Sequence, residues 1–290
     1  NGVSSRHLPV TLQSPSKSRG LIIQGVIWSR GPLPRTGEFF EHLKKRGKKI
    51  HYVSNNSLRT KENYEAQFKS VDITDGFENL TVPSTAIAEY LKSVNLKKKV
   101  YCVTCPQTAR VIESYGFQVV EGPDVGSTYY ADYIQYLVDD EEIGAVVFDS
   151  DFRINLAKMY KATAYLKRPD VLFINGASDK IIPLKPGLIA IGVQPFTDVV
   201  QEHVKREPVQ LGKPGKEFGV FAMKRAGATD PSRVLFIGDM IEQDVGLGKA
   251  AGFQTLLVLT TSTKETMLAQ TTLRPDYYAP NLGSIVPQLE

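Results

Sequence analysis

The chain has 290 residues, of which 42% are hydrophobic and 23% charged, and its formal net charge at pH 7 is only +4. This composition is typical of a globular protein and excludes a fibrous, collagen-like or largely disordered chain. The hydrophobic runs are too short to span a bilayer, and no charged-then-hydrophobic leader opens the sequence, so we expect no membrane association and a cytoplasmic location.

After a polar segment at residues 1–17, which we expect to be a disordered extension, hydrophobic runs of strand length alternate with stretches of helical spacing. The predicted strands are 21–28, 50–53, 100–103, 145–148, 171–174, 234–237 and 255–259. The predicted helices are 38–45, 85–94, 109–114, 156–166, 197–204, 218–226 and 245–251. Because the strands are continuously hydrophobic, both of their faces should be covered, which indicates an α/β fold with a mainly parallel sheet.

Basic residues gather in two short blocks, at 44–49 and 97–99, each between a predicted helix and a predicted strand. We expect these cations to complement helix C-termini and to stay solvated. A nucleic-acid partner would require a longer basic stripe with interleaved aromatic residues, so none is expected.

Polar residues follow three of the hydrophobic runs: Ser54 and Asn55, then Lys213, then Asp239. The carboxyl ends of parallel strands meet at one edge of a sheet, where ligands bind. A hydroxyl, an exposed amide, an ammonium and a carboxylate can together hold a phosphate group and its metal. Each of the three strand ends alone fits ordinary turn chemistry, but the three together favour a site.

The ordered motifs Gly25-Val26-Ile27-Trp28, Val53-Ser54-Asn55-Asn56-Ser57, Gly212-Lys213-Pro214 and Gly238 to Asp244 resemble those of the haloacid dehalogenase superfamily. Within it they are most similar to the group of 4-nitrophenylphosphatases, phosphoglycolate phosphatases and pyridoxal phosphate phosphatases. The resemblance implies a Rossmann-like core at residues 18–97 and 184–290, with an α/β cap inserted at residues 98–183.

The resemblance also assigns roles to the matching residues. Phosphate binding would fall to Ser54 and Asn55, charge stabilisation to Lys213, and magnesium ligation to Asp239 with support from Asp244. In the cap, Asp179 matches a position that the group usually keeps acidic, and the cap would carry substrate selection and homodimer contacts.

The first motif departs from the family pattern, which reads Asp-x-Asp-Gly-Val-Leu-Trp with a nucleophilic first aspartate and an acid/base second aspartate. Here Ile22 and Gln24 occupy those positions, and no Asp or Glu occurs before Glu38. Isoleucine has no heteroatom to attack phosphorus, and glutamine exchanges no proton near neutral pH. With one carboxylate lost, we expect no cofactor and at best weak magnesium binding.

These observations favour a pseudophosphatase that binds a protein partner or a phosphorylated ligand without turning it over. The alternative is a residual magnesium-dependent phosphatase that uses water in place of the missing aspartate and acts on a small phosphate monoester. A third interpretation uses Cys102-x-x-Cys105 as a reactive thiol pair before a helix, against the simpler view of one buried strand residue and one loop residue.

Overall fold

The computed structural model describes residues 19–27, 31, 33–124, 129–185 and 187–290. The polar segment at 1–17 and Trp28 therefore lie outside the described residues. The chain divides into two compact units, the first formed by residues 1–54, 59–81 and 213–290 and the second by residues 55–58 and 82–212. Both units are α/β, as the sequence predicts.

The first unit is built on a six-stranded sheet in the order β13-β12-β11-β1-β2-β3, and all neighbouring strands are parallel. Its strands are β1 (Arg19–Ile23), β2 (Lys49–Val53), β3 (Leu80–Thr81), β11 (Val234–Gly238), β12 (Gln254–Val258) and β13 (Tyr277–Ala279). Its α-helices are α2 (Gln24–Ile27), α3 (Thr36–Lys45), α4 (Lys61–Lys69), α9 (Lys216–Arg225), α10 (Gly246–Ala250) and α11 (Lys264–Ala269). Three short turns complete it: η2 (Pro231–Arg233), the π-helical η3 (Ile241–Val245) and η4 (Gly283–Gln288).

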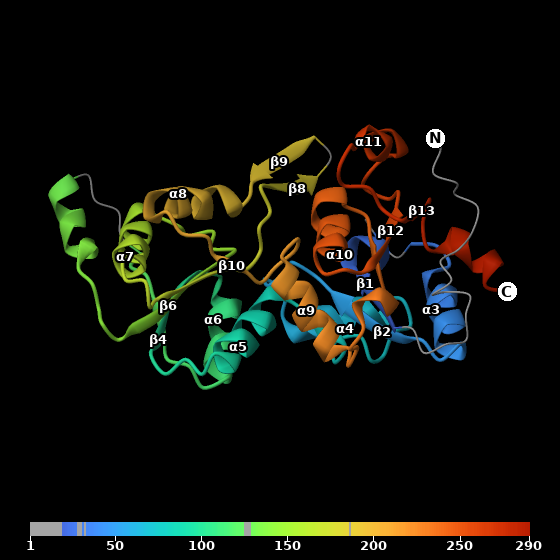
Figure 1. Ribbon diagram of the computed structural model, residues 1–290, viewed down its shortest axis with the longest axis horizontal. Coiled ribbons are helices and arrows are strands. Elements are labelled where there is room, and N and C mark those ends of the chain that lie inside the picture. The colour runs from blue at the N-terminus through green and yellow to red at the C-terminus, as the bar shows by residue number, and fades with distance from the viewer. Residues whose placement is uncertain (1–18, 28–30, 32, 125–128, 186) are drawn as a thin grey trace. The chain divides into compact units, whose positions relative to one another are not determined.

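The second unit contains a five-stranded parallel sheet in the order β10-β7-β6-β4-β5 and a separate antiparallel hairpin (Figure 1). The sheet strands are β4 (Lys99–Thr104), β5 (Val119–Glu121), β6 (Ile143–Asp149), β7 (Leu172–Asn175) and β10 (Val209–Gln210), and the hairpin strands are β8 (Ile181–Lys185) and β9 (Leu188–Ile191). The helices are α5 (Pro83–Ser93), α6 (Pro106–Ser114), η1 (Tyr130–Leu137), α7 (Leu156–Leu166) and α8 (Gln194–Val204).

Burial explains why the sheets form where the hydrophobic runs occur. Every residue of β6 and of β11 is buried, as expected for central parallel strands covered on both faces. In the second unit, Tyr101, Phe173 and Tyr165 belong to one buried cluster. The N-terminus of α7 is fixed by Asn155, whose side chain accepts a hydrogen bond of 3.0 Å from the backbone of Lys158.

The second unit is longer than the predicted cap at residues 98–183. It begins earlier because α5 packs against α6, and it ends later because α8 packs against α7 and β10 pairs with β7. Local hydrophobic pattern does not reveal these tertiary contacts. The strand predicted at 21–28 ends earlier than expected. β1 ends at Ile23, and Gln24 begins the short helix α2.

Candidate functional site

The site is built on the loop that follows β11, in the first unit. Asp239 comes directly after Gly238, the last residue of β11, and the π-helical turn η3 then carries Asp244. The backbone amides of Asp239 and Met240 each donate a hydrogen bond of 3.0 Å to Asp244 Oδ2. A Cβ atom at position 238 would lie 2.2 Å from that of Asp244, so this close approach requires glycine.

Lys213 forms an ion pair with Asp244. Its Nζ atom donates to Asp244 Oδ1 at 2.7 Å, and both side chains are buried, at 8% and 2% relative exposure. The sequence predicts that Lys213 follows a strand of the same sheet, but this is wrong. The preceding strand β10 belongs to the second sheet, and Lys213 reaches the site because the chain returns to the first unit immediately after Gly212.

Asp239 is also held by the segment after β12. The hydroxyl of Thr261 donates to Asp239 Oδ2, and the backbone and hydroxyl of Ser262 both donate to the Asp239 carbonyl, at 3.1 and 2.7 Å. Burial, followed by the negative charge of Asp244, raises the pKa of the Asp239 carboxyl, while Lys213 acts in the opposite sense. Sequence reasoning assigned no role to Thr261 or Ser262, although they follow a strand adjacent to β11.

Ser54 follows β2, two strands away from β11 in the same sheet. It is buried, its amide donates to the Thr81 carbonyl at 3.1 Å, and Tyr64 of α4 donates a hydrogen bond of 3.2 Å to its hydroxyl. No pattern in the sequence pointed to Tyr64, because α4 is too polar to be recognised as a packed helix. Asn55 and Asp179 belong to the second unit, in which Asp179 lies just before β8.

The backbone of β1 shows where Ile22 and Gln24, the two residues that depart from the family pattern, lie in the first unit. β1 lies between β2 and β11, and Ile22 is paired with Ile237 on one side and Tyr52 on the other. Ile22 is therefore level with a residue two positions before Asp239. Gln24 comes just after the end of β1, as the first residue of α2.

Two family models match the chain: the haloacid dehalogenase-like hydrolase model over residues 22–118 and the HAD-hydrolase-like model over residues 210–285. Together these ranges cover more than half of the chain and contain the site residues after β2 and β11. The chain belongs to the haloacid dehalogenase-like hydrolases. This confirms the resemblance found in the sequence.

Relatives of this family align over almost the whole chain. Phosphoglycolate phosphatase 2 of Arabidopsis thaliana is 29% identical over 92% of this chain and 91% of its own length. The 4-nitrophenylphosphatase of Schizosaccharomyces pombe is 26% identical over 90% of each chain. Among solved structures, p-nitrophenyl phosphatase from Archaeoglobus fulgidus superposes with a TM-score of 0.77 at 28% identity, covering 94% of this chain and 99% of the other.

The side chains present fit a magnesium ion poorly. Magnesium prefers near-octahedral oxygen ligation, often through more than one carboxylate. Here one oxygen of Asp244 is bound to Lys213 and the other to two backbone amides, and Ile22 has no oxygen in its side chain. Within the described ranges, no group of three or more His, Cys, Asp or Glu side chains is arranged to hold a metal ion.

Cys102 and Cys105 do not form a reactive pair. Cys102 lies within β4 and Cys105 is the residue before α6, and both are buried. Burial raises the pKa of both thiols, and the nearby Asp149 carboxylate raises that of Cys105 further. The simpler prediction, a buried strand residue and a loop residue, is therefore confirmed.

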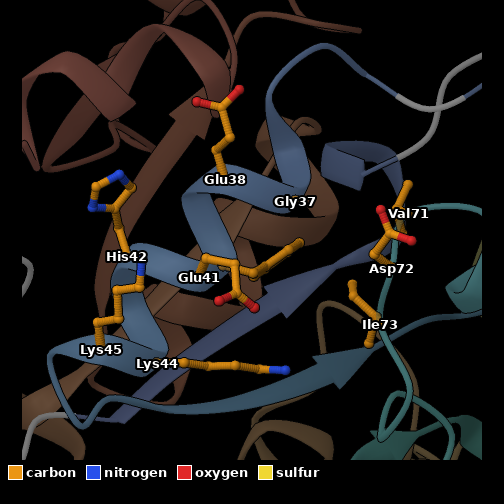
Figure 2. A pocket seen from close by; sticks show the side chains of 10 residues that line it. Gly37, Glu38, Glu41, His42, Lys44, Lys45, Val71, Asp72 and Ile73 are labelled. Carbon is orange, nitrogen blue, oxygen red and sulfur yellow. The ribbon is translucent and has the colours of Figure 1, made fainter.

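A pocket of about 360 Å³ lies between α3 and residues 71–73, away from the residues described above (Figure 2). Its charged lining is mixed, with three carboxylates beside a histidine and two lysines: Glu38, Glu41, Asp72, His42, Lys44 and Lys45. It contains none of the site residues that the sequence predicts.

No helix in the described part of the chain is long and hydrophobic enough to cross a membrane.

Proposed function

We propose that this chain is a pseudophosphatase: a member of a hydrolase family that binds its ligand or partner but does not hydrolyse a phosphate ester through a covalent intermediate. The observation that carries the proposal is the register of β1, which puts Ile22 between the two strands that precede Ser54 and Asp239. In the family pattern this position belongs to the nucleophile.

The chemistry of the substituted residues supports this proposal. Attack on phosphorus requires an oxygen nucleophile, and a hydrocarbon side chain at position 22 supplies none. The amide of Gln24 neither gives nor takes a proton near neutral pH, so leaving-group protonation is also lost. Residues that act as a catalytic unit fail together, and their combined loss leaves only positioning and electrostatics.

The residues that would hold an anion are retained, which supports a binding role. Lys213 remains buried beside Asp244, and Ser54 remains at the end of β2. The names of the relatives refer to phosphoglycolate, glycerol 3-phosphate and 4-nitrophenyl phosphate, all of which are phosphate monoesters. The ligand class that we propose is accordingly a small phosphate monoester, bound in a reducing compartment such as the cytoplasm.

The second unit is the proposed contact surface for a protein partner, beginning with a second copy of this chain. The hairpin β8–β9 exposes hydrophobic side chains that a water-facing hairpin does not need: Ile181, Leu188, Ile189 and Ile191. Exposed hydrophobic patches of this kind mark interaction surfaces. Sedimentation velocity of the chain and of the Ile189→Lys/Ile191→Lys variant tests this part, and an unchanged monomer in both would contradict self-association.

The activity is tested by hydrolysis of para-nitrophenyl phosphate with excess magnesium. We expect no turnover by the unchanged chain, and magnesium-dependent turnover after the double change Ile22→Asp/Gln24→Asp. The matched control is Ile22→Asn/Gln24→Asn, which has nearly the same shape but no nucleophile and should stay inactive.

The residual-phosphatase alternative makes the opposite prediction. The unchanged chain would then hydrolyse the substrate, and Lys213→Ala would abolish the rate because the developing negative charge loses its cation. That pair of results would contradict the pseudophosphatase proposal.

A further inference from the structure

The short helix η1 of the second unit carries hydrophobic side chains on an exposed surface. None of its eight residues is buried, although most of them are hydrophobic or aromatic. Tyr130, Ile134 and Leu137 are 73, 54 and 42% exposed, and Val138, the next residue along the chain, is 63% exposed. Ile134 and Leu137 are three residues apart, the spacing at which side chains of a 3-10 helix lie above one another. We call these four residues the η1 patch.

Two other tyrosines attach η1 to its own unit. The ring of Tyr133 meets the ring of Tyr160 in α7 edge to face, with centroids 6.0 Å apart, and Tyr136 meets Tyr133 in the same way at 6.2 Å. η1 therefore lies beside α7 in the second unit (Figure 1). The residues of the η1 patch stay exposed in spite of this packing. Neighbouring exposed hydrophobic side chains with a polar rim are typical of an interaction surface.

The charge beside the η1 patch is negative. Residues 129–142 contain no Lys, Arg or His but have five carboxylates: Asp132, Asp139, Asp140, Glu141 and Glu142. Arg168 pairs with Asp139 at 2.8 Å and Lys99 pairs with Glu142, which leaves an excess of three negative charges. The wider stretch 111–152 contains ten carboxylates and no cationic residue, in a chain whose net charge is +4. This net charge acts on an approaching partner whether or not each carboxylate is hydrogen-bonded within the chain.

The negative charge restricts what can cover the patch. A nucleic acid or an anionic membrane surface carries charge of the same sign and would be repelled. A second copy that met this patch through a two-fold axis would bring the same carboxylates face to face. A segment that combines hydrophobic side chains with Lys or Arg complements both properties. The eight residues of η1 span roughly 16 Å, the length of about three turns of a partner α-helix.

We propose that the η1 patch is a docking surface for a short, basic amphipathic helix of another protein. Hydrophobic side chains of that helix cover Tyr130, Ile134 and Leu137, and its cations face the acidic residues that follow η1. Because neither the site at Asp239 nor the hairpin β8–β9 takes part, the proposal stands whether or not the chain is a pseudophosphatase or self-associates.

The test is fluorescence anisotropy of a labelled synthetic peptide of leucine and lysine, with amphipathic order and about 12 residues, a little over three helical turns. The peptide is titrated with the full chain at low ionic strength. We expect it to bind, and a leucine–glutamate peptide of the same order not to bind. This comparison shows whether the charge of the partner matters.

A pair of charge-neutral variants locates the binding surface. Ile134→Gln/Leu137→Gln removes two hydrophobic side chains of the patch, and we expect it to weaken binding of the leucine–lysine peptide at least tenfold. The matched control is Ile189→Gln/Ile191→Gln, which removes two exposed hydrophobic side chains from the hairpin β8–β9 of the same unit. We expect less than a twofold change in the control.

A second pair of variants changes only charge and alters no buried side chain. Glu141→Lys reverses an exposed charge beside the patch, and we expect binding to weaken at least threefold at low ionic strength and less as salt is added. Glu217→Lys makes the same change at an exposed position of α9 in the first unit and should have less than a twofold effect. Three results would overturn the proposal: no binding of the leucine–lysine peptide by the unchanged chain, equal binding of the leucine–glutamate peptide, or equal weakening within either matched pair of variants.

Discussion

Each unit has a buried carboxylate near the carboxyl end of its sheet, but the two carboxylates are satisfied in different ways. In the second unit, Asp149 at the end of β6 accepts hydrogen bonds from neutral groups, the Thr108 hydroxyl at 2.7 Å and the Ala177 amide at 3.0 Å. In the first unit, Asp244 is bound to the ammonium group of Lys213. The comparison indicates that Asp149 joins segments of the second unit through neutral donors, whereas Asp244 holds the ammonium group of Lys213 in place.

The largest loss of stability is expected at Asp244, the carboxylate that is paired with a charged group. Asp244→Asn keeps an acceptor for the two backbone amides but leaves the buried Lys213 without its counter-charge, so we expect the free energy of unfolding of the first unit to fall by about 3 kcal/mol. Urea unfolding followed by hydrogen exchange of the β11 amides measures this loss. The neighbouring, exposed Glu242→Gln is the control, and an equal loss in it would contradict the assignment.

A smaller loss of stability is expected at Asp149, the carboxylate that accepts hydrogen bonds from neutral groups. Asp149→Asn places an NH₂ group against hydroxyl and amide donors, so we expect the second unit to lose about 2 kcal/mol through unsatisfied hydrogen bonds. Hydrogen exchange of the β6 amides reports this unit separately. The exposed Glu141→Gln serves as control, and a loss as large as that at Asp244 would remove the proposed difference between the two carboxylates.

Two buried groups, His51 in the first unit and Asp149 in the second, should respond oppositely to acid. Burial lowers the pKa of His51 in β2 to about 3, below its ordinary value of 6.5, so the unfolded chain binds one more proton than the folded chain between these values. Stability from this group is full above pH 6.5 and falls by about 1.4 kcal/mol for each pH unit below it. Burial raises the pKa of Asp149, so the contribution of this group to stability instead increases as pH falls.

The contribution of His51 is isolated by comparing urea unfolding of the unchanged chain and of His51→Gln at pH 7.5 and 5.5. Glutamine can keep the 2.8 Å hydrogen bond to Thr81 but does not titrate. The unchanged chain should lose about 1.4 kcal/mol more than the variant over this range. Parallel losses in the two proteins would show that His51 is not buried in its neutral form.

The smallest effect concerns the two cysteines near the carboxyl end of the second sheet. Because both thiols are buried and their pKa values are raised, neither should react with Ellman's reagent in the folded chain, and both should react in denaturant. Cys105→Ala should cost only about 1 kcal/mol, since the thiol makes weak contacts with Thr108 and Ser57. Rapid labelling of the folded chain would restore the reactive-pair interpretation.

Sequence pattern was sufficient for the central strands and for most helices, because both depend on hydrophobic periodicity. The predicted helix at 156–166, for example, has the same bounds as α7. It was not sufficient for α4, in which only Tyr64 and Phe68 are buried, or for the hairpin β8–β9, in which Ile181, Leu188, Ile189 and Ile191 are exposed. The end of β1 was missed because a short hydrophobic run does not distinguish a strand from a buried helical turn.

The residues of the candidate site also fall into those that the sequence predicts and those that it does not. The sequence predicts that Lys213, Asp239 and Asp244 act together, and the ion pair joins two of them while backbone contacts join the third. The contact of Thr261 with Asp239 depends on which strands are neighbours in the sheet, and that order is not written in any one motif.

Two residues of the candidate site lie where the backbone passes from one unit to the other. Ser54 is the last residue before the chain first enters the second unit, and Lys213 is the first residue after its final return. The backbone at these two residues therefore also connects the two units. Two of the four backbone connections between the units therefore adjoin a residue to which the family resemblance assigns phosphate binding or charge stabilisation.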